Sequence, residues 1–295
     1  MRDTCFGSVF AILAAGLFWL LTPPPAAGQA PAATPQPAPI VRGADGHPDI
    51  QGWWETSAYA ADMETGLPDE ETATIQGTGR PDPAKAVSNV IDPPDGRMPY
   101  QAWAAARRVS IPTFRRGESS RGVPQTLRDI RPRTFCLHGT PRNMVSDFQV
   151  VQARGLVVLA WEFSHAYRLI PLDDRPALPE RIKLAQGQSV GRWEGDTLIV
   201  RTTNLNDWDW FDYTGTFHTD AMTLEERFTV VDANTIDYRA TVTDPKVFTR
   251  PWTFRIPLNK RRVEPGYEML EHACVEGERG VEYLLKQSAT TGQGR

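Results

Sequence analysis

One carboxylate in this sequence stands where a strand should be apolar. Side chains at every second position of a strand share a face, and in the segment Thr223–Val231 that face carries Leu224, Glu226, Phe228 and Val230. Burial of an unpaired carboxylate is costly and raises its pKa toward neutrality, where a general acid or base works best. The pattern therefore indicates either an acid–base site or a buried ion pair.

The following segment, Thr235–Thr243, supplies the neighbours of this carboxylate. A three-residue loop at 232–234 sets Phe228 opposite Tyr238 and Glu226 opposite Ala240. The small Ala240 side chain leaves space beside Glu226, and the Tyr238 hydroxyl is suited to donate a proton. We expect Glu226 and Tyr238 to act together if the site is catalytic.

Two further observations bear on the same chemistry. The alternative for Glu226 is a structural pair with an inward-facing arginine, for which Arg168 is one possibility. A second carboxylate, Glu162, is predicted to line the interior because small or aliphatic side chains precede it on its face: Leu156, Val158 and Ala160. The opposite face of that segment is also apolar, which suggests a strand covered on both sides.

A histidine lies close to another carboxylate between two predicted strands. His218 and Asp220 are two residues apart, and a carboxylate can orient a histidine that acts as a base. The alternative is a turn in which Asp220 accepts backbone hydrogen bonds. Arg142 would serve as a clamp for an anion or an oxyanion.

The segment Asn204–Tyr213 mixes acidic and aromatic side chains. Its Asp207, Asp209 and Asp212 lack the glycine and closing glutamate of an EF-hand loop. We therefore expect an aromatic wall over a ligand, or plain loop packing, rather than a metal site. The predicted ligand-binding aromatic residues are Trp193, Trp208, Trp210 and Phe228.

Common cofactor and nucleophile motifs are missing from the sequence. The five histidines have no zinc-ligand spacing, and G-x-S-x-G, P-loop and G-x-G-x-x-G patterns do not occur. The sequence therefore predicts no cofactor and no metal. A net charge of −4 and a pI near 5.8 argue against nucleic acid as a partner.

The amino terminus has the composition of a secretory signal peptide, assigned to residues 1–28. Arg2 precedes the apolar run Phe6–Leu21, which is shorter than the roughly 20 residues that span a membrane. We expect cleavage near Gly28 and a soluble protein in the periplasm or outside the cell. A Pro/Ala-rich disordered tether (29–47), a single β-barrel domain (48–288) and a disordered tail (289–295) are predicted to follow.

Two cysteines remain after removal of the signal peptide. In an oxidising compartment, Cys136 and Cys274 are expected to form a disulfide that joins the C-terminal segment to the start of the sheet. The alternative is two separate buried thiols. A nucleophilic pair of Cys136 with His138 conflicts with the bridge.

The remaining periodicity predicts the fold. From residue 147 onward apolar residues alternate with a period of two, in segments separated by turns. The predicted strands are Phe148–Ala153, Leu156–Phe163, Tyr167–Pro171, Ser189–Trp193, Thr197–Thr203, Thr223–Val231, Thr235–Thr243 and Thr249–Leu258.

A sequential set of antiparallel strands needs protected edges. We therefore expect an up-and-down antiparallel β-barrel of the calycin or lipocalin kind, or a strongly curled sheet as the alternative. Helices are predicted at Met98–Val109 and Glu264–Val275, with long loops at 56–97 and 111–133.

Several short motifs resemble a large group of exported bacterial proteins that have no assigned reaction. The most specific is Gly191-Arg-Trp-Glu-Gly-Asp196, and others are Cys136-Leu-x-Gly-x-Pro-Arg142, Gly215-x-x-His218-Thr and Glu226-Arg-Phe228. The resemblance covers most of residues 48–280. It implies export, a β-rich body, and signature positions at Glu226, His218, Arg142 and Trp193.

This chain departs from the group's usual pattern at three positions. Gln188 and Thr223 stand where members often carry histidine, and Asp220 stands where they carry glutamate. Taken together, the sequence predicts a cofactor-independent acid–base enzyme of the lyase, isomerase or hydratase type, acting on a small apolar or aromatic compound. The alternative is a binding protein with the same pocket and no turnover. The oligomeric state is left open.

Overall fold

The computed structural model describes residues 37–56, 62–65, 87–111, 126–130, 136, 147–162, 165–212, 214–270 and 286. All of them belong to the unit Pro37–Arg295. None of the helices in these described ranges is long and apolar enough to cross a membrane.

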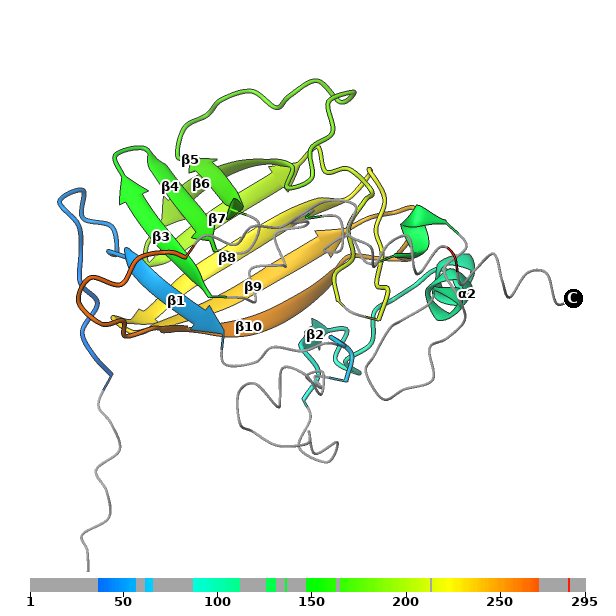
Figure 1. The fold of residues 1–295 in the computed structure, drawn as a ribbon, viewed down its shortest axis with the longest axis horizontal. Helices are drawn as coiled ribbons and strands as arrows, with labels where there is room; N and C mark the ends of the chain where they lie inside the picture. Colours follow the sequence, from blue (N-terminus) through cyan, green and yellow to red (C-terminus); the bar gives the residue numbers. More distant parts are fainter. Residues whose placement is uncertain are drawn as a thin grey trace, which may run out of the picture. The chain divides into compact units, whose positions relative to one another are not determined.

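Ten antiparallel strands form one sheet (Figure 1). They are β1 (Gly52–Thr56), β2 (Val90–Asp92), β3 (Phe148–Ala153), β4 (Leu156–Trp161), β5 (Tyr167–Pro171), β6 (Gln188–Glu194), β7 (Thr197–Thr203), β8 (Thr223–Asp232), β9 (Thr235–Thr243) and β10 (Trp252–Lys260). The predicted strands from 148 onward are confirmed, within one to three residues at their ends.

The order of the strands confirms the predicted barrel. The path runs β5-β4-β3-β1-β10-β9-β8-β7-β6, so neighbours in the sheet are neighbours in the chain except where β1 joins β3 to β10. β2 lies off this path and pairs with β10. The sheet is nearly closed, and its two end strands, β5 and β6, meet without a hydrogen-bonded ladder. We call this junction the seam.

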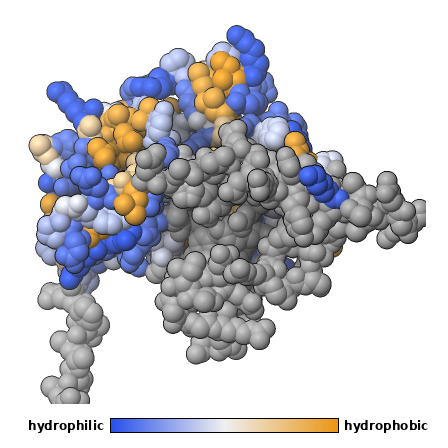
Figure 2. All heavy atoms as spheres, in the orientation of Figure 1, coloured by the Kyte–Doolittle hydropathy of each residue, from blue (hydrophilic) through white to orange (hydrophobic). Residues whose placement is uncertain are grey.

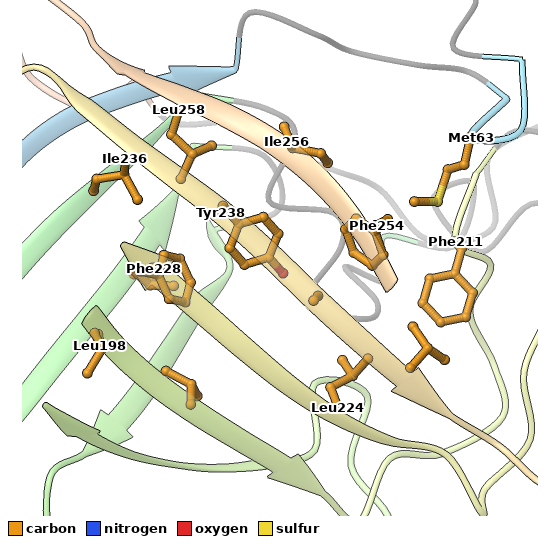
Figure 3. Packing of buried hydrophobic residues seen from close by; sticks show 14 of the residues in the cluster. Met63, Leu198, Phe211, Leu224, Phe228, Ile236, Tyr238, Phe254, Ile256 and Leu258 are labelled. Atoms are coloured by element: carbon orange, nitrogen blue, oxygen red, sulfur yellow. The ribbon is translucent and has the colours of Figure 1, made fainter. Parts of the chain in front are cut away.

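Alternation along the strands builds the core. One row of facing residues runs across four strands, from Leu198 to Phe228, Tyr238 and Ile256. Figure 3 shows these side chains on the inner side of the sheet, together with Met63 and Phe211 from the segments that pack against one end. Burial of each large apolar side chain contributes about 1.5–3 kcal/mol relative to exposure, so this row is a principal source of stability.

The turns fix the register that the sequence predicted. Phe228 faces Tyr238 and Glu226 faces Ala240. The register shifts between Val230 and Asp232, which marks a bulge in β8. Asp232 pairs with Thr235, so the loop has two residues instead of the three that the sequence predicted. Gly195 adopts a φ of 58° in the turn between β6 and β7, a conformation in which a residue without a Cβ is favoured.

The predicted helix at Met98–Val109 is confirmed in its body as α2 (Ala102–Ser110). It starts later because the preceding backbone is engaged elsewhere: the Gln101 amide donates to the Val247 carbonyl at 2.8 Å. The predicted loop at 111–133 contains a short 3-10 helix, η2 (Leu127–Asp129).

Two predictions need correction. The helix predicted at Glu264–Val275 is wrong over its described part, 264–270, which holds a turn closed by the Tyr267 amide and the Glu264 carbonyl at 3.0 Å. The tether predicted at 29–47 is too long, because its last residues contact the barrel. Arg42 forms an ion pair with Asp196 at 2.8 Å, and the Ala233 amide donates to the Ala38 carbonyl.

Candidate functional site

The buried carboxylate of Glu226 is held by an arginine from a distant strand. Arg168 on β5 donates through Nη1 to Oε1 at 3.0 Å and through Nη2 to Oε2. The Tyr238 hydroxyl donates to Oε1 at 2.8 Å, and the Thr202 hydroxyl lies 3.3 Å from Oε2. Both side chains are almost fully buried, at 2% exposure for Arg168 and 0% for Glu226. The predicted structural alternative, a pair with Arg168, is therefore confirmed.

The same guanidinium bridges the seam. Its Nε donates to Ser189 Oγ on β6 at 2.8 Å, and its Nη2 donates to Thr202 Oγ1 on β7 at 2.7 Å. Because β5 and β6 share no backbone ladder, these bonds tie β5 to β6, β7 and β8 through one side chain. In this arrangement Glu226 is a fixed counter-ion, and Tyr238 already uses its proton to bond it. Neither residue is placed to take a proton from a ligand.

Gly191 explains why the seam can close. A Cβ built on this residue would lie 2.8 Å from Ile170 Cγ2 and 2.9 Å from Leu172 Cδ2. Real Cβ contacts are longer, so a larger residue here would force the side chains of Ile170 and Leu172 to shift away from β6. The glycine at the head of the Gly-Arg-Trp-Glu-Gly-Asp motif thus has a packing role.

His218 is buried but is not oriented by Asp220. Its Nδ1 lies 3.1 Å from the Thr219 carbonyl, and its ring packs edge-on against Phe211 at 5.5 Å. Burial lowers the pKa of His218, so the ring stays neutral, with Nδ1 as the donor and Nε2 as an acceptor. Nε2 is buried and finds no partner among the described residues.

The predicted His218–Asp220 pair is wrong because Asp220 lies at the surface. Its Oδ1 bonds Lys246 Nζ at 2.9 Å. The carboxylate that organises this turn is instead Asp244, which is buried and accepts from the Thr219 amide at 2.6 Å and from the Thr219 hydroxyl.

Glu162 follows β4 in a bend, and it is half-buried. The buried face of β4 carries Val157, Leu159 and Trp161. The sequence could not choose between the two faces because both are apolar. The role of Glu162 in lining the interior stays a prediction.

The predicted aromatic ligand wall is dispersed. Trp193 stacks on His47 with ring centroids 5.3 Å apart, and Trp208 lies under the Arg128 guanidinium at 4.7 Å. Trp210 is buried in a bridge with Phe217, and Phe228 packs in the core. The structure does not bring these four side chains to one ligand.

The other predicted site residues either form local ion pairs and hydrogen bonds or lie outside the described residues. Asp207 pairs with Arg128 at 2.8 Å, and the Asp212 carboxylate accepts from the Thr214 and Thr216 amides. No group of three or more His, Cys, Asp or Glu within the described ranges is arranged to hold a metal ion. Arg142 and Cys274 lie outside the described residues, so the anion clamp and the bridge to Cys136 stay predictions.

A charged cluster that the sequence did not reveal lies at the α2 end of the barrel. Arg108 on α2 bonds Glu64 Oε2 at 2.5 Å, Thr214 Oγ1 at 2.9 Å and Asp62 Oδ1 at 3.5 Å. Asp212 Oδ2 lies 4.0 Å from the same guanidinium. These residues come from three separate segments of the chain and share no motif. Only the tertiary fold therefore identifies them as a group.

Asp62 is the unusual member of this cluster. Desolvation by burial, followed by repulsion from Asp212, raises its pKa, although Arg108 acts in the opposite direction. The Asp62 side chain is 17% exposed, whereas that of Glu226 is 0% exposed. Its Oδ1 accepts from the Glu64 amide at 3.0 Å, and its Oδ2 has no partner among the described residues. Such a carboxyl group keeps its proton to a higher pH than an ordinary aspartate does.

A groove of about 410 Å³ lies on the outer face of β6 and β7, beside the loop that follows β5. Its lining includes three arginines and two aspartates: Arg175, Arg192, Arg201, Asp173 and Asp174. Asp173 engages Arg175, and Glu194 engages Arg192, each within 2.8 Å. Arg201 makes no ion pair within the described part of the chain, although Glu225 on β8 is its direct cross-strand neighbour.

Comparisons with known proteins add no family. A scan against protein-family models, a search of curated proteins and a search of solved structures each gave no match for this chain.

Proposed function

We propose that this protein binds a small anionic molecule in the groove on the outer face of β6 and β7, without turning it over. The observation that carries the proposal is Arg201, an exposed guanidinium with no ion pair in the described structure, in the lining of a groove of about 410 Å³. That volume is in the range of about 300–1,000 Å³ found for small-molecule sites.

The groove favours a polar ligand over the apolar compound predicted from the sequence. Five of its ten lining residues are charged, and Gln188 and Thr203 add further polar groups beside the apolar Val190 and Ala177. Guanidinium groups match carboxylates and phosphates in shape and charge. A small carboxylate or phosphate with further polar groups is therefore the ligand class that we propose.

Acid–base catalysis by Glu226 has little support by comparison. The carboxylate already accepts bonds from Arg168, Tyr238 and Thr202, and it is closed to solvent. An enzyme that used Glu226 as a base would first have to break the buried pair, which is costly.

Isothermal titration calorimetry with succinate and with succinamide, its uncharged analogue, tests the proposal. We expect the wild type to bind succinate and not succinamide. Arg201→Gln should weaken succinate binding at least tenfold, as expected for loss of a charged hydrogen bond of about 1.5–3 kcal/mol. Arg239→Gln is the matched control, since Arg239 is exposed on β9 and lies outside the groove. Equal affinity of the wild type and Arg201→Gln for succinate would overturn the proposal, as would absence of binding.

Asp62 supports a second candidate function, proton transfer to or from a small carbonyl compound. Its raised pKa, its partial exposure and its unpartnered Oδ2 are the properties of a general acid or base. Deuterium incorporation into small ketones in D₂O, followed by NMR, measures such transfer without knowledge of the substrate. The wild type and Asp95→Asn should exchange the α-protons faster than Asp62→Asn. Equal rates for all three would remove Asp62 as a base.

We further propose export with cleavage near Gly28 and a bridge between Cys136 and Cys274, on the sequence features given above. Mass spectrometry of the intact protein from the periplasm tests both. The expected mass corresponds to a chain that starts after Gly28 and gains 2 Da on reduction. An unprocessed chain would contradict export, and an unchanged mass would contradict the bridge.

A further inference from the structure

The outer side of β3, β4 and β5 has a composition unlike the rest of the barrel. Three rows of facing residues cross these strands there. They are Ala153–Leu156–Pro171, Val151–Val158–Leu169 and Gln149–Ala160–Tyr167. Only Gln149 is polar among these nine residues, and none is charged. We call this surface the β3–β5 apolar face.

Most of the face is open to solvent, although Pro171 at one corner is buried. Tyr167 is 65% exposed, Leu169 49% and Val151 42%. Figure 2 shows apolar surface gathered over this part of the sheet, next to strongly hydrophilic surface. Contiguous exposed apolar surface on a folded protein commonly marks a contact site.

The other outward strands provide an internal comparison. Outward positions on β7, β8 and β9 carry Arg201, Glu225, Arg227, Asp237 and Arg239. The outer side of those strands is solvated and carries charged and Thr side chains, as is common for antiparallel sheets. The β3–β5 apolar face is therefore not a general property of this barrel.

Charged side chains mark the two ends of the face. Arg154 lies in the β3–β4 turn, and Glu162 follows the opposite end of β4 in a half-buried bend. Each is four positions from Val158, the central residue of the central row. Neither makes an ion pair within the described part of the chain. A positive end and a negative end are thus placed symmetrically about the centre.

We propose that the β3–β5 apolar face binds the same face of a second copy of this chain, with the strands of the two copies antiparallel. A two-fold axis through Val158, across the strands, places Arg154 of one copy beside Glu162 of the partner subunit. The same axis stacks the central row, Val151–Val158–Leu169, on its own copy. Like charges would meet if the strands were parallel, so the end charges select the antiparallel arrangement.

The sizes of the side chains suit this arrangement. Under the same axis, Leu156 of one copy lies over the smaller Ala160 of the partner subunit. Two sheets that face each other pack about 10 Å apart with interdigitating side chains. A charged partner surface would lose hydration against this face, whereas an identical uncharged face would not.

The extent of the face predicts a weak dimer. Three strands about 4.8 Å apart and about 20 Å long provide a centre of a few hundred Å², less than the roughly 800 Å² per partner of a standard interface. The association should therefore depend on protein concentration, rather than being obligate.

Analytical ultracentrifugation of the full chain from about 1 to about 300 µM tests the proposal, since that range spans the affinities expected of a small interface. The wild type should shift from monomer to dimer as concentration rises. Leu169→Lys places two cations on the two-fold axis and should remain monomeric. Val231→Lys is the matched control, because Val231 is 53% exposed on β8, and it should behave as the wild type does.

Charge reversal tests the arrangement independently. Arg154→Glu and Glu162→Arg should each weaken the dimer by about tenfold, because symmetry changes two contacts at once. The double variant should restore the affinity. A wild type that stays monomeric throughout, or a Leu169→Lys variant that still dimerises, would overturn the proposal. A double variant no tighter than the single variants would overturn the antiparallel arrangement.

Discussion

Arg168 on β5 holds both carboxylate oxygens of Glu226 on β8, which lies two strands beyond β6 in the sheet. On the way its guanidinium bonds Ser189 on β6 and Thr202 on β7. A single side chain thus joins four strands where the backbone makes no ladder between β5 and β6. The carboxylate that looked like a candidate base in the sequence is part of the closure of the sheet.

Removal of one member of this pair should be strongly destabilising. Glu226→Leu leaves the buried Arg168 charge without its counter-ion, and we expect a loss of about 3–5 kcal/mol in the free energy of unfolding. Urea denaturation followed by tryptophan fluorescence measures it. The double variant Arg168→Met with Glu226→Leu removes both charges and should recover at least half of that loss.

The surface pair of Asp220 with Lys246 is the control for burial. Both side chains are about half exposed or more, so Asp220→Asn should leave the urea midpoint unchanged within error. If Glu226→Leu were equally mild, the Arg168–Glu226 pair would not be holding the sheet together.

Gly191→Ala should also open the seam. The new Cβ would meet Ile170 Cγ2 at 2.8 Å and Leu172 Cδ2 at 2.9 Å, and we expect a cost of about 1–3 kcal/mol from overpacking. Thermal unfolding checks this value. Ile170→Ala removes one of the two atoms, so the double variant should cost less than the sum of the single variants. Strict additivity would show that Gly191 and Ile170 do not interact.

His218 should make the stability of the protein sensitive to mild acid. Burial holds its pKa below the ordinary value of 6.5, so the unfolded chain binds a proton more readily than the folded chain does. Stability is therefore fully present above pH 6.5 and is lost as the pH falls through 6.5 toward the lower pKa of the folded state. Urea midpoints at pH 7.5 and pH 5 should differ in the wild type, and the difference should shrink in His218→Gln.

The exposed His165 supplies the control for this titration. His165→Asn should keep the wild-type pH dependence, because Asn tolerates the positive φ of 48° at this position. An unchanged pH dependence in His218→Gln would show that His218 does not cause it.

Asp62 should lower the stability of the protein as the pH rises, which is opposite to the effect of His218. Its pKa is raised above 3.8 by burial and by Asp212, so the folded state is penalised once the carboxyl group ionises. That penalty is absent below pH 3.8 and grows as the pH rises through the raised pKa. The stability of Asp62→Asn relative to the wild type should therefore increase between pH 4 and pH 7. Asp95→Asn, in an exposed loop, should show no such trend.

The fold was largely predictable because its signals are local. Alternation and turn residues sufficed for the β8–β9 hairpin, where Phe228 faces Tyr238 as expected. The contribution of β1 was not predictable, since its pairing with both β3 and β10 depends on contacts between the two ends of the domain. The helix predicted at Glu264–Val275 ignored Pro265 and Gly266, which favour the observed turn.

The candidate site was less predictable because its residues are joined through tertiary contacts. Arg168 was one possible partner for Glu226, but nothing near either residue in the sequence selects it. Both faces of β4 are apolar, so only the packing of the sheet shows which face meets the core. Asp62 and Arg108 carry no recognisable pattern, and they become a group only when α2 packs at the end of the barrel.

The seam closes through side chains alone, so we expect transient local opening of the barrel to occur there first. Separation of β5 from β6 would cost the Arg168 contacts and the packing of Ile170 on Gly191, but no backbone ladder. Slow hydrogen exchange should therefore persist in the middle of the sheet, on β8, β9 and β10, while the amides of β5 and β6 exchange through transient opening. The two end strands would therefore separate by losing the Arg168 contacts and the Ile170 packing, without unfolding of the rest of the sheet.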